Sequence, residues 1–222
     1  MSDENKNDAL TGRSGPLSVS KTAMLVIDVQ EYIAVPGKGE YSDIDPNDIP
    51  EHLTYFFDRI ENNVIANTAK LQRACRDAGI EVLFTVVENL TKDGRDRSLD
   101  YKISQINVPK GSSGAKVPKA IAPINDEIVF PKTTSSVFNS TMIDYVLRNL
   151  GVEQLIVTGL LTDQCVESSV RDACDKGYIV KLAADACGTY SQERHDNAIS
   201  AYSGYCHVTD TATVLNMIKE AQ

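Results

Sequence analysis

The sequence lacks the features that mark several common classes of protein. No apolar stretch approaches the roughly 20 residues of a membrane span, and the first twenty residues have no apolar core of the kind found in secretory signals. No cluster of lysine and arginine stands out, and the net charge is −9. This balance argues against nucleic acid or an anionic membrane as a partner. We therefore expect a protein that binds neither.

The cysteines also exclude some possibilities. The five of them include no CxxC pair and show no regular spacing. Their odd number and scattered placement indicate reduced thiols, so we expect a cytoplasmic protein without a disulfide framework.

The order of apolar and polar segments predicts the fold. Residues 1–20 are polar and acidic and are expected to form a flexible arm, whereas residues 21–222 are expected to form a single domain. Short β-rich apolar runs alternate with amphipathic helical stretches, which predicts an α/β fold with three α-β-α layers. Its centre is an open, doubly wound, Rossmann-like sheet of six mostly parallel strands. The predicted strands are residues 23–28, 80–87, 126–130, 154–158, 178–183 and 206–209. The main predicted helices are residues 56–78, 141–150, 162–176, 193–202 and 212–221.

The segment VTGLLTDQCVESSVRDACDKGY, residues 157–178, reads as the end of a strand, a sharp turn and a helix that opens at Cys165. A thiol in the first turn of a helix faces unpaired backbone N–H groups and the positive end of the helix dipole. Both favour the thiolate, so Cys165 is a candidate nucleophile. The alternative is a small buried side chain that fills space between helix and sheet.

Three reactive side chains follow predicted strands. Asp28 ends the first strand, Lys132 follows the third, and Cys165 follows the fourth. In an open parallel sheet, ligands bind at the carboxyl ends of the strands. A carboxylate can take the thiol proton and return it to a leaving amine, while an ammonium group stabilises both. Each residue taken alone has a structural alternative: Asp28 could cap a turn, Lys132 could be a solvated surface charge, and Cys165 could fill space in the core.

Four pieces of sequence extend this pattern: AMLVIDVQ at 23–30, IVFPKTTSSVF at 128–138, the segment 157–178, and AADACGTY at 183–190. Together they resemble the isochorismatase-like hydrolase superfamily, in its cysteine-hydrolase branch. The resemblance implies a catalytic triad of Asp28, Lys132 and Cys165. It also implies a cis peptide bond between Leu160 and Leu161, and an oxyanion hole formed by the N–H groups of Leu161 and Cys165.

The resemblance also narrows the activity. A nucleophilic cysteine argues for amide or carbamoyl chemistry rather than the vinyl ether chemistry of isochorismatase itself. Nicotinamidases of this superfamily hold a metal with an aspartate and closely spaced histidines after the first strand. Here that segment offers one histidine, His52, and no His-x-His pair occurs in the chain. We therefore expect no metal and no cofactor.

The segment 88–119 is expected to be a long surface excursion. Its first part, 88–102, resembles the substrate loop of ureidoacrylate amidohydrolases. Arg95 and Arg97 can hold a substrate carboxylate, Glu88 can accept hydrogen bonds from an amide, and Phe138 can form an apolar wall. The alternative for the arginines is a solvated loop, and the alternative for Phe138 is a plain role in the core. Gln30, in DVQ, resembles a position that supports the first loop and is a candidate substrate contact.

The sequence thus predicts an amidohydrolase that cleaves a C–N bond of a small amide, ureido or carbamoyl substrate through a thioester, with a ureidoacrylate-like substrate favoured. A nicotinamidase-like enzyme or a streptothricin-type lactam hydrolase is the enzymatic alternative. A pseudoenzyme or binding module of the same fold is the non-enzymatic one, and a redox role for Cys165 is a third. By resemblance alone, the protein is expected to form a homo-oligomer, a dimer or tetramer.

Overall fold

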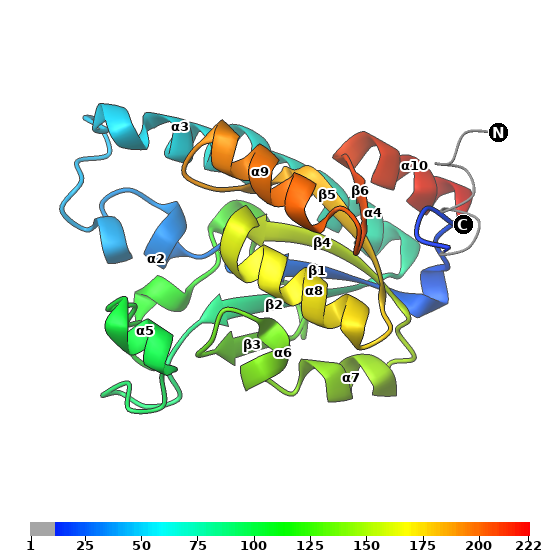
Figure 1. Ribbon diagram of the computed structural model, residues 1–222, viewed down its shortest axis with the longest axis horizontal. Helices are drawn as coiled ribbons and strands as arrows, with labels where there is room; N and C mark the ends of the chain where they lie inside the picture. Colours follow the sequence, from blue (N-terminus) through cyan, green and yellow to red (C-terminus); the bar gives the residue numbers. More distant parts are fainter. Residues whose placement is uncertain (1–11) are drawn as a thin grey trace.

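The structure is a computed structural model that describes residues 12–222. Its centre is a six-stranded sheet in the order β3-β2-β1-β4-β5-β6, and all five neighbouring pairs are parallel. The strands are β1 (Thr22–Ile27), β2 (Glu81–Val87), β3 (Val129–Lys132), β4 (Gln154–Leu160), β5 (Ile179–Gly188) and β6 (His207–Thr209). The predicted open, doubly wound α/β fold is confirmed (Figure 1).

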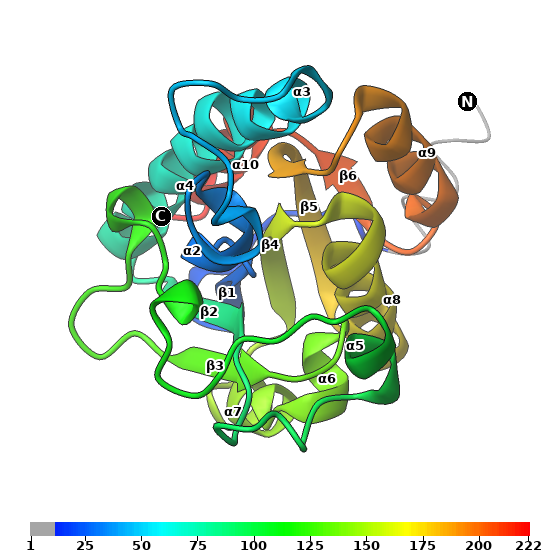
Figure 2. The same cartoon turned by 90° about the vertical axis from the view of Figure 1, so that its left-hand side faces the viewer.

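Alternation along the strands builds two cores, one on each face of the sheet. Helices cover both faces (Figure 2). Met24 and Val26 of β1 face one core, whereas Leu25 and Ile27 face the other, because successive side chains of a strand point to opposite faces. The first core is covered by α3 (Glu51–Arg59), α4 (Ala66–Ala78) and α10 (Thr211–Glu220). The second is covered by α6 (Val137–Ser140), α7 (Ile143–Asn149), α8 (Glu167–Asp175) and α9 (Gln192–Tyr202).

The predicted helix 56–78 is longer and less regular than expected. It begins at Glu51 and runs through α3, a π-helical segment η3 (Ile60–Ile65) and α4. It ends at Gly79, as predicted, where a φ of 76° gives the left-handed conformation that glycine adopts without steric cost.

The third strand is displaced from its predicted range, 126–130. The Glu127 carboxylate accepts hydrogen bonds from Arg76 Nε at 2.7 Å and from the backbone N–H of Ile124 at 2.9 Å. These bonds hold residues before Val129 in a turn, so β3 starts later and continues through Lys132. Strand β5 runs to Gly188, five residues beyond its predicted end at residue 183.

The predicted arm, residues 1–20, lies partly outside the described residues. The rest of it, from residue 12 onward, is packed on the domain: Leu17 is buried, and the Gln154 side chain joins this segment to β4. Gln154 Oε1 accepts from the N–H of Ser18 at 2.8 Å, and its Nε2 donates to the carbonyl of Pro16 at 3.0 Å. The structure therefore places residues 12–20 against the end of the sheet where β4 begins.

The excursion 88–119 crosses the opposite end of the sheet, where the strands finish (left in Figure 1). It carries α5 (Leu99–Ile103) and the short 3-10 helix η4 (Ser113–Ala115) and leads into a second, η5 (Lys119–Ile121). Tyr101 and Val108 are buried and pack with Val87 at the end of β2. The segments α2 (Glu31–Ala34) and η2 (Gly39–Tyr41) lie at the same end. Within residues 12–222, no helix is long and apolar enough to cross a membrane.

Candidate active site

The candidate site lies where β1 and β4 end side by side. The chain connections leave these two adjacent strands toward opposite edges of the sheet, which is the place where open α/β sheets bind ligands. Gly159 of β4 has a φ of 132°, and a side chain there would overlap the carbonyl oxygen of Ile27. Glycine therefore permits the close approach that brings Asp28, just after β1, next to the segment that carries Cys165.

Asp28 forms the acidic part of the site. It is buried and has a φ of 54°, which is rare for a residue other than glycine. Its Oδ1 accepts a hydrogen bond from Thr85 Oγ1 at 3.0 Å, and its Oδ2 lies 2.7 Å from Lys132 Nζ. A carboxylate oxygen has more than one lone pair, so the buried Oδ2 can take up a proton while it stays in contact with the Lys132 ammonium.

Lys132 connects the acid to the thiol. It is the last residue of β3 and is completely buried. Besides its ion pair with Asp28, Nζ donates to the carbonyl oxygen of Thr134 at 2.8 Å and to Cys165 Sγ at 3.3 Å. Burial lowers the pKa of Lys132, but the charge of Asp28 and the smaller contributions of Cys165 and Tyr101 together outweigh it and hold the pKa above its usual range. The side chain is therefore a fixed ammonium group.

Cys165 is half-buried in a π-helical segment, η6 (Thr162–Val166), which continues directly into α8. Burial raises the pKa of its thiol to about 11; Lys132 acts in the opposite direction, and the charge of Asp28 raises the pKa further. The expectation that the helix start favours a resting thiolate is therefore wrong. The group rests as a thiol because desolvation and the nearby carboxylate outweigh the ammonium group.

The three residues form a set with zero net charge. With Asp28 ionised and Lys132 protonated, the Cys165 thiol is neutral. Transfer of the thiol proton to Asp28 creates a thiolate beside the ammonium and leaves the net charge unchanged. A buried site resists changes in net charge, so the arrangement can form a thiolate by this internal transfer.

Tyr101, on α5, is a site residue that the sequence reasoning missed. Its buried hydroxyl accepts a hydrogen bond from Lys132 Nζ at 3.1 Å and lies 3.8 Å from Cys165 Sγ. Burial raises the pKa of this phenol well above its usual range, so it stays a neutral hydroxyl. The only sequence signal was its place in the stretch 88–102, where the arginines drew attention instead.

The peptide bond between Leu160 and Leu161 is cis, as the resemblance implies. Both residues line the same cavity as Cys165, which follows Leu161 by four positions in the chain. The N–H groups of Leu161 and Cys165 thus belong to one short segment at the end of β4. Their role as oxyanion donors stays a prediction.

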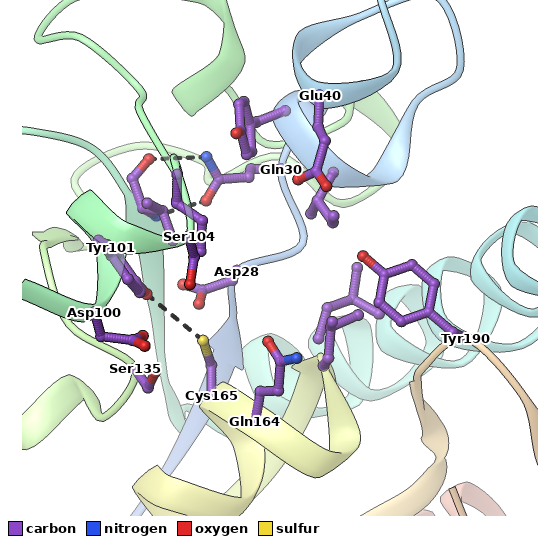
Figure 3. Close-up of a pocket in the computed structure, with 16 residues that line it drawn as sticks. Asp28, Gln30, Glu40, Asp100, Tyr101, Ser104, Ser135, Gln164, Cys165 and Tyr190 are labelled. Carbon is purple, nitrogen blue, oxygen red and sulfur yellow. Dashed lines mark hydrogen bonds between the residues drawn. The ribbon is translucent and has the colours of Figure 1, made fainter. Parts of the chain in front are cut away.

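The site opens into a cavity of about 470 Å³, a size suited to a small molecule (Figure 3). Asp28, Tyr101 and Cys165 lie at its floor and sides, whereas Glu40 and Tyr190 face it from the other side. The full lining is Asp28, Gln30, Tyr32, Ile33, Glu40, Val87, Asp100, Tyr101, Ser104, Ile106, Ser135, Leu160, Leu161, Gln164, Cys165 and Tyr190.

Gln30 lines the cavity but is engaged by the backbone. Its Nε2 donates to the carbonyl oxygens of Val87 at 2.9 Å and Gly114 at 3.0 Å, and its Oε1 accepts from the N–H of Val87 at 2.6 Å. The side chain is completely buried. Gln30 therefore ties the loop after β1 to the end of β2 and to η4, which fits its predicted supporting role better than substrate contact.

Four other predicted substrate contacts lie outside the cavity lining. Glu88 Oε1 accepts from the N–H of Gly111 at 2.8 Å. The exposed Arg95 pairs with its neighbour Asp93 at 2.9 Å. The Arg97 guanidinium donates to carbonyl oxygens of its own loop, at 3.0 and 2.8 Å. Phe138 packs in the second core and stacks on the ring of Tyr178, with centroids 5.9 Å apart.

Within residues 12–222, no group of three or more His, Cys, Asp or Glu side chains is placed to hold a metal ion. The prediction of a reaction without metal stays a prediction. All five cysteines are unpaired.

Comparison with known proteins identifies the family. The family model for the isochorismatase domain matches residues 22–213. The chain is 31% identical over 199 residues to the ureidoacrylate amidohydrolase RutB of Pseudomonas syringae pv. syringae, covering 80% of this chain and 75% of that one. It is 25% identical over 169 residues to nicotinamidase 3 of Arabidopsis thaliana, covering 73% and 81%.

A solved structure supports the same assignment at the level of the fold. The cysteine hydrolase from Pseudomonas syringae pv. phaseolicola 1448A superposes with a TM-score of 0.79 at 23% identity, covering 93% of this chain and 96% of that one. The chain therefore belongs to the isochorismatase family and is a hydrolase.

Proposed function

We propose that the protein is an amidohydrolase that cleaves a C–N bond of a small amide, ureido or carbamoyl substrate through a thioester on Cys165. One observation carries the proposal. Lys132 Nζ lies 2.7 Å from Asp28 Oδ2 and 3.3 Å from Cys165 Sγ, and both of these partners line one cavity of small-molecule size. The amidohydrolase and nicotinamidase among the relatives support C–N chemistry.

The first half-reaction forms the thioester. Asp28 takes the thiol proton as Sγ bonds to the substrate carbonyl carbon, and the carbonyl oxygen becomes an oxyanion. The N–H groups of Leu161 and Cys165 stabilise that oxyanion. When the tetrahedral intermediate collapses, the C–N bond breaks and Asp28 gives the proton to the leaving nitrogen. Lys132 stays protonated throughout and offsets the negative charge as it moves between sulfur and carboxylate.

The second half-reaction hydrolyses the thioester. Asp28, again a carboxylate, takes a proton from water as the water oxygen bonds to the acyl carbon. Collapse breaks the C–S bond, and the proton returns from Asp28 to sulfur. The products are a carboxylic or carbamic acid and an amine or ammonia, and the three residues return to their starting protonation.

The sequence favoured a ureidoacrylate-like substrate, which carries a carboxylate. The two arginines predicted to hold that carboxylate lie outside the cavity lining, and one of them is paired with Asp93. The geometry therefore does not favour this substrate over other small amides. Lactam and nicotinamide-like substrates stay candidates.

The test is release of ammonia or amine from a panel of small amides, ureido acids, carbamoyl amino acids, nicotinamide and biuret. Cys165→Ala should abolish turnover of any substrate that the wild type cleaves, with an unchanged fold by circular dichroism. Cys174→Ala, in the neighbouring helix α8, is the matched control and should keep activity. Turnover by Cys165→Ala at the wild-type rate would refute the proposal, as would the absence of any turned-over amide.

The same panel, run with a chelator, tests the predicted independence from metal. Loss of activity that a divalent metal restores would contradict it. The cytoplasmic location and the homo-oligomer stay predictions, the latter open to light scattering.

A further inference from the structure

The charged lining of the cavity is entirely acidic. Asp28, Glu40 and Asp100 line it, but no arginine, lysine or histidine among residues 12–222 does so. The ammonium of Lys132 is completely buried and already engaged by Asp28. A substrate carboxylate would therefore meet carboxylates of like charge and no free cation.

Glu40 is the acid best placed to recognise a ligand. It belongs to η2, and its side chain points into the cavity near Tyr190, on the side away from Tyr101 (Figure 3). No described residue forms an ion pair with Glu40, and its neighbour Lys38 pairs with Glu31 instead, at 2.8 Å. Glu40 is an exposed residue that lines the cavity, yet desolvation by its surroundings raises the pKa of its carboxyl group, and a bound cation would relieve that cost.

Two phenol groups complete this end of the cavity. Tyr32 and Tyr190 both line it; burial raises the pKa of each phenol, and the negative charge of Glu40 raises it further. Both stay neutral hydroxyls with rings that can contact a cation. This end thus offers one carboxylate and two aromatic rings, which is a site for an ammonium or guanidinium group.

We propose that the substrate carries a cationic group remote from its scissile amide, and that Glu40 binds this group while Cys165 attacks the amide. The inference rests on the proposed function and deepens it by naming the substrate class. A cationic amide would reach from Glu40, at one side of the cavity, to Cys165 at the other.

The experiment compares three matched amides: 6-aminohexanamide, heptanamide and the monoamide of pimelic acid, with shorter homologues of each. They differ only in the remote group, which is an ammonium, a methyl or a carboxylate. For the wild type, we expect kcat/KM to be about tenfold higher for the ammonium amide than for the neutral one, because a charged hydrogen bond to Glu40 forms only with the ammonium. The carboxylate amide should give the lowest value, because its charge has the same sign as that of Glu40.

Glu40→Gln should remove the preference for the cation, measured as the ratio of kcat/KM for the ammonium amide to kcat/KM for the neutral amide, because only the charge is lost. Asp43→Asn is the matched control: it also removes one negative charge from an exposed residue, but Asp43 does not line the cavity. Its preference should equal that of wild type. A preference for the carboxylate amide, or an unchanged preference in Glu40→Gln, would overturn the inference.

Binding separates failure of the inference from failure of the proposed function. The Cys165→Ala protein, which cannot form the thioester, is titrated with the same three amides by calorimetry. Tighter binding of the ammonium amide that is lost on adding Glu40→Gln supports the inference, even if no amide is hydrolysed. Equal binding of all three, or no binding, contradicts it, even if wild type hydrolyses the neutral amide through Cys165.

Discussion

Replacing Asp28 by asparagine should separate the ionisation of Cys165 from catalysis. With a pKa of about 11, only about one Cys165 thiol in a thousand is ionised at pH 8. The negative charge of Asp28 contributes to that high value and is absent in Asp28→Asn. In that variant, the Lys132 ammonium still lies 3.3 Å from Cys165 Sγ and stabilises the thiolate, with no carboxylate beside it. We expect the pKa of Cys165 to fall, and the thiolate fraction at pH 8 to rise about tenfold or more.

Hydrolysis should change in the opposite direction. Without a carboxylate, the leaving nitrogen receives no proton and water has no general base, which costs about 10²- to 10⁴-fold in kcat. A variant with a more nucleophilic cysteine should thus be a much poorer enzyme. This opposition is specific to a mechanism in which Asp28 moves protons.

The assay is alkylation by iodoacetamide across pH, followed by mass spectrometry of the peptide that contains Cys165, beside steady-state amide hydrolysis. Cys75 and Cys187, whose pKa values burial raises to about 12, are internal references that should not change. Melting temperature must be recorded, because loss of the partner of a buried charge can cost about 3–5 kcal/mol. Slower alkylation of Asp28→Asn than of wild type, or hydrolysis at the wild-type rate, would refute this reasoning.

Three further predictions address residues around the site. Tyr101→Phe should lower kcat about tenfold with little change in KM, since it removes a hydroxyl from the charged set, whereas Tyr145→Phe, at an exposed position, should have no effect in the same kinetics. Gln30→Leu leaves backbone groups of Val87 and Gly114 unpaired, so it should reduce the free energy of unfolding, measured by urea titration, by about 3 kcal/mol. An unfolding free energy equal to that of wild type would contradict this prediction. Burial lowers the pKa of His195 from 6.5 to about 4, so between these pH values the imidazole is protonated in the unfolded chain but not in the folded one. The free energy of unfolding should therefore fall by about 2 kcal/mol from pH 7 to pH 5. His195→Asn should remove most of that pH dependence.

The sequence predicted those parts of the fold that depend on local pattern. The continuous apolar run of β1 and the glycine after α4 act within a few residues, so the strand and the end of the helix were predictable. The start of β3 was not, because it depends on Arg76 of α4 holding Glu127, 51 residues away in sequence. Contacts of that kind have no signature in a single local window.

The same distinction applies to the site. Asp28 and Cys165 follow buried apolar strands, and parallel strands bring such positions to one edge of the sheet, so their proximity could be predicted. Tyr101 lies in a long irregular segment, and only its packing with Val87 and Val108 directs its hydroxyl to Lys132. The ionisation of Cys165 was mispredicted because the helix start is a local feature, whereas desolvation comes from the assembled site.

The substrate loop shows the limit of reading charge from sequence. Arg95 and Arg97 suggested an anion site, but both are held by groups of their own loop. Glu40 drew no attention because it lies in an irregular segment rich in glycine and proline, and its approach to the cavity depends on how that segment folds back over the sheet.

The central claim is that the sulfur of Cys165 forms a covalent bond with the acyl part of the substrate. The direct measurement is rapid acid quenching of wild-type enzyme during turnover of a cleaved amide, with mass spectrometry of the intact protein and its peptides. The account predicts an added mass equal to that of the acyl group, located on the peptide that contains Cys165 and absent in Cys165→Ala. An acyl group on another residue, or full turnover by Cys165→Ala, would contradict it.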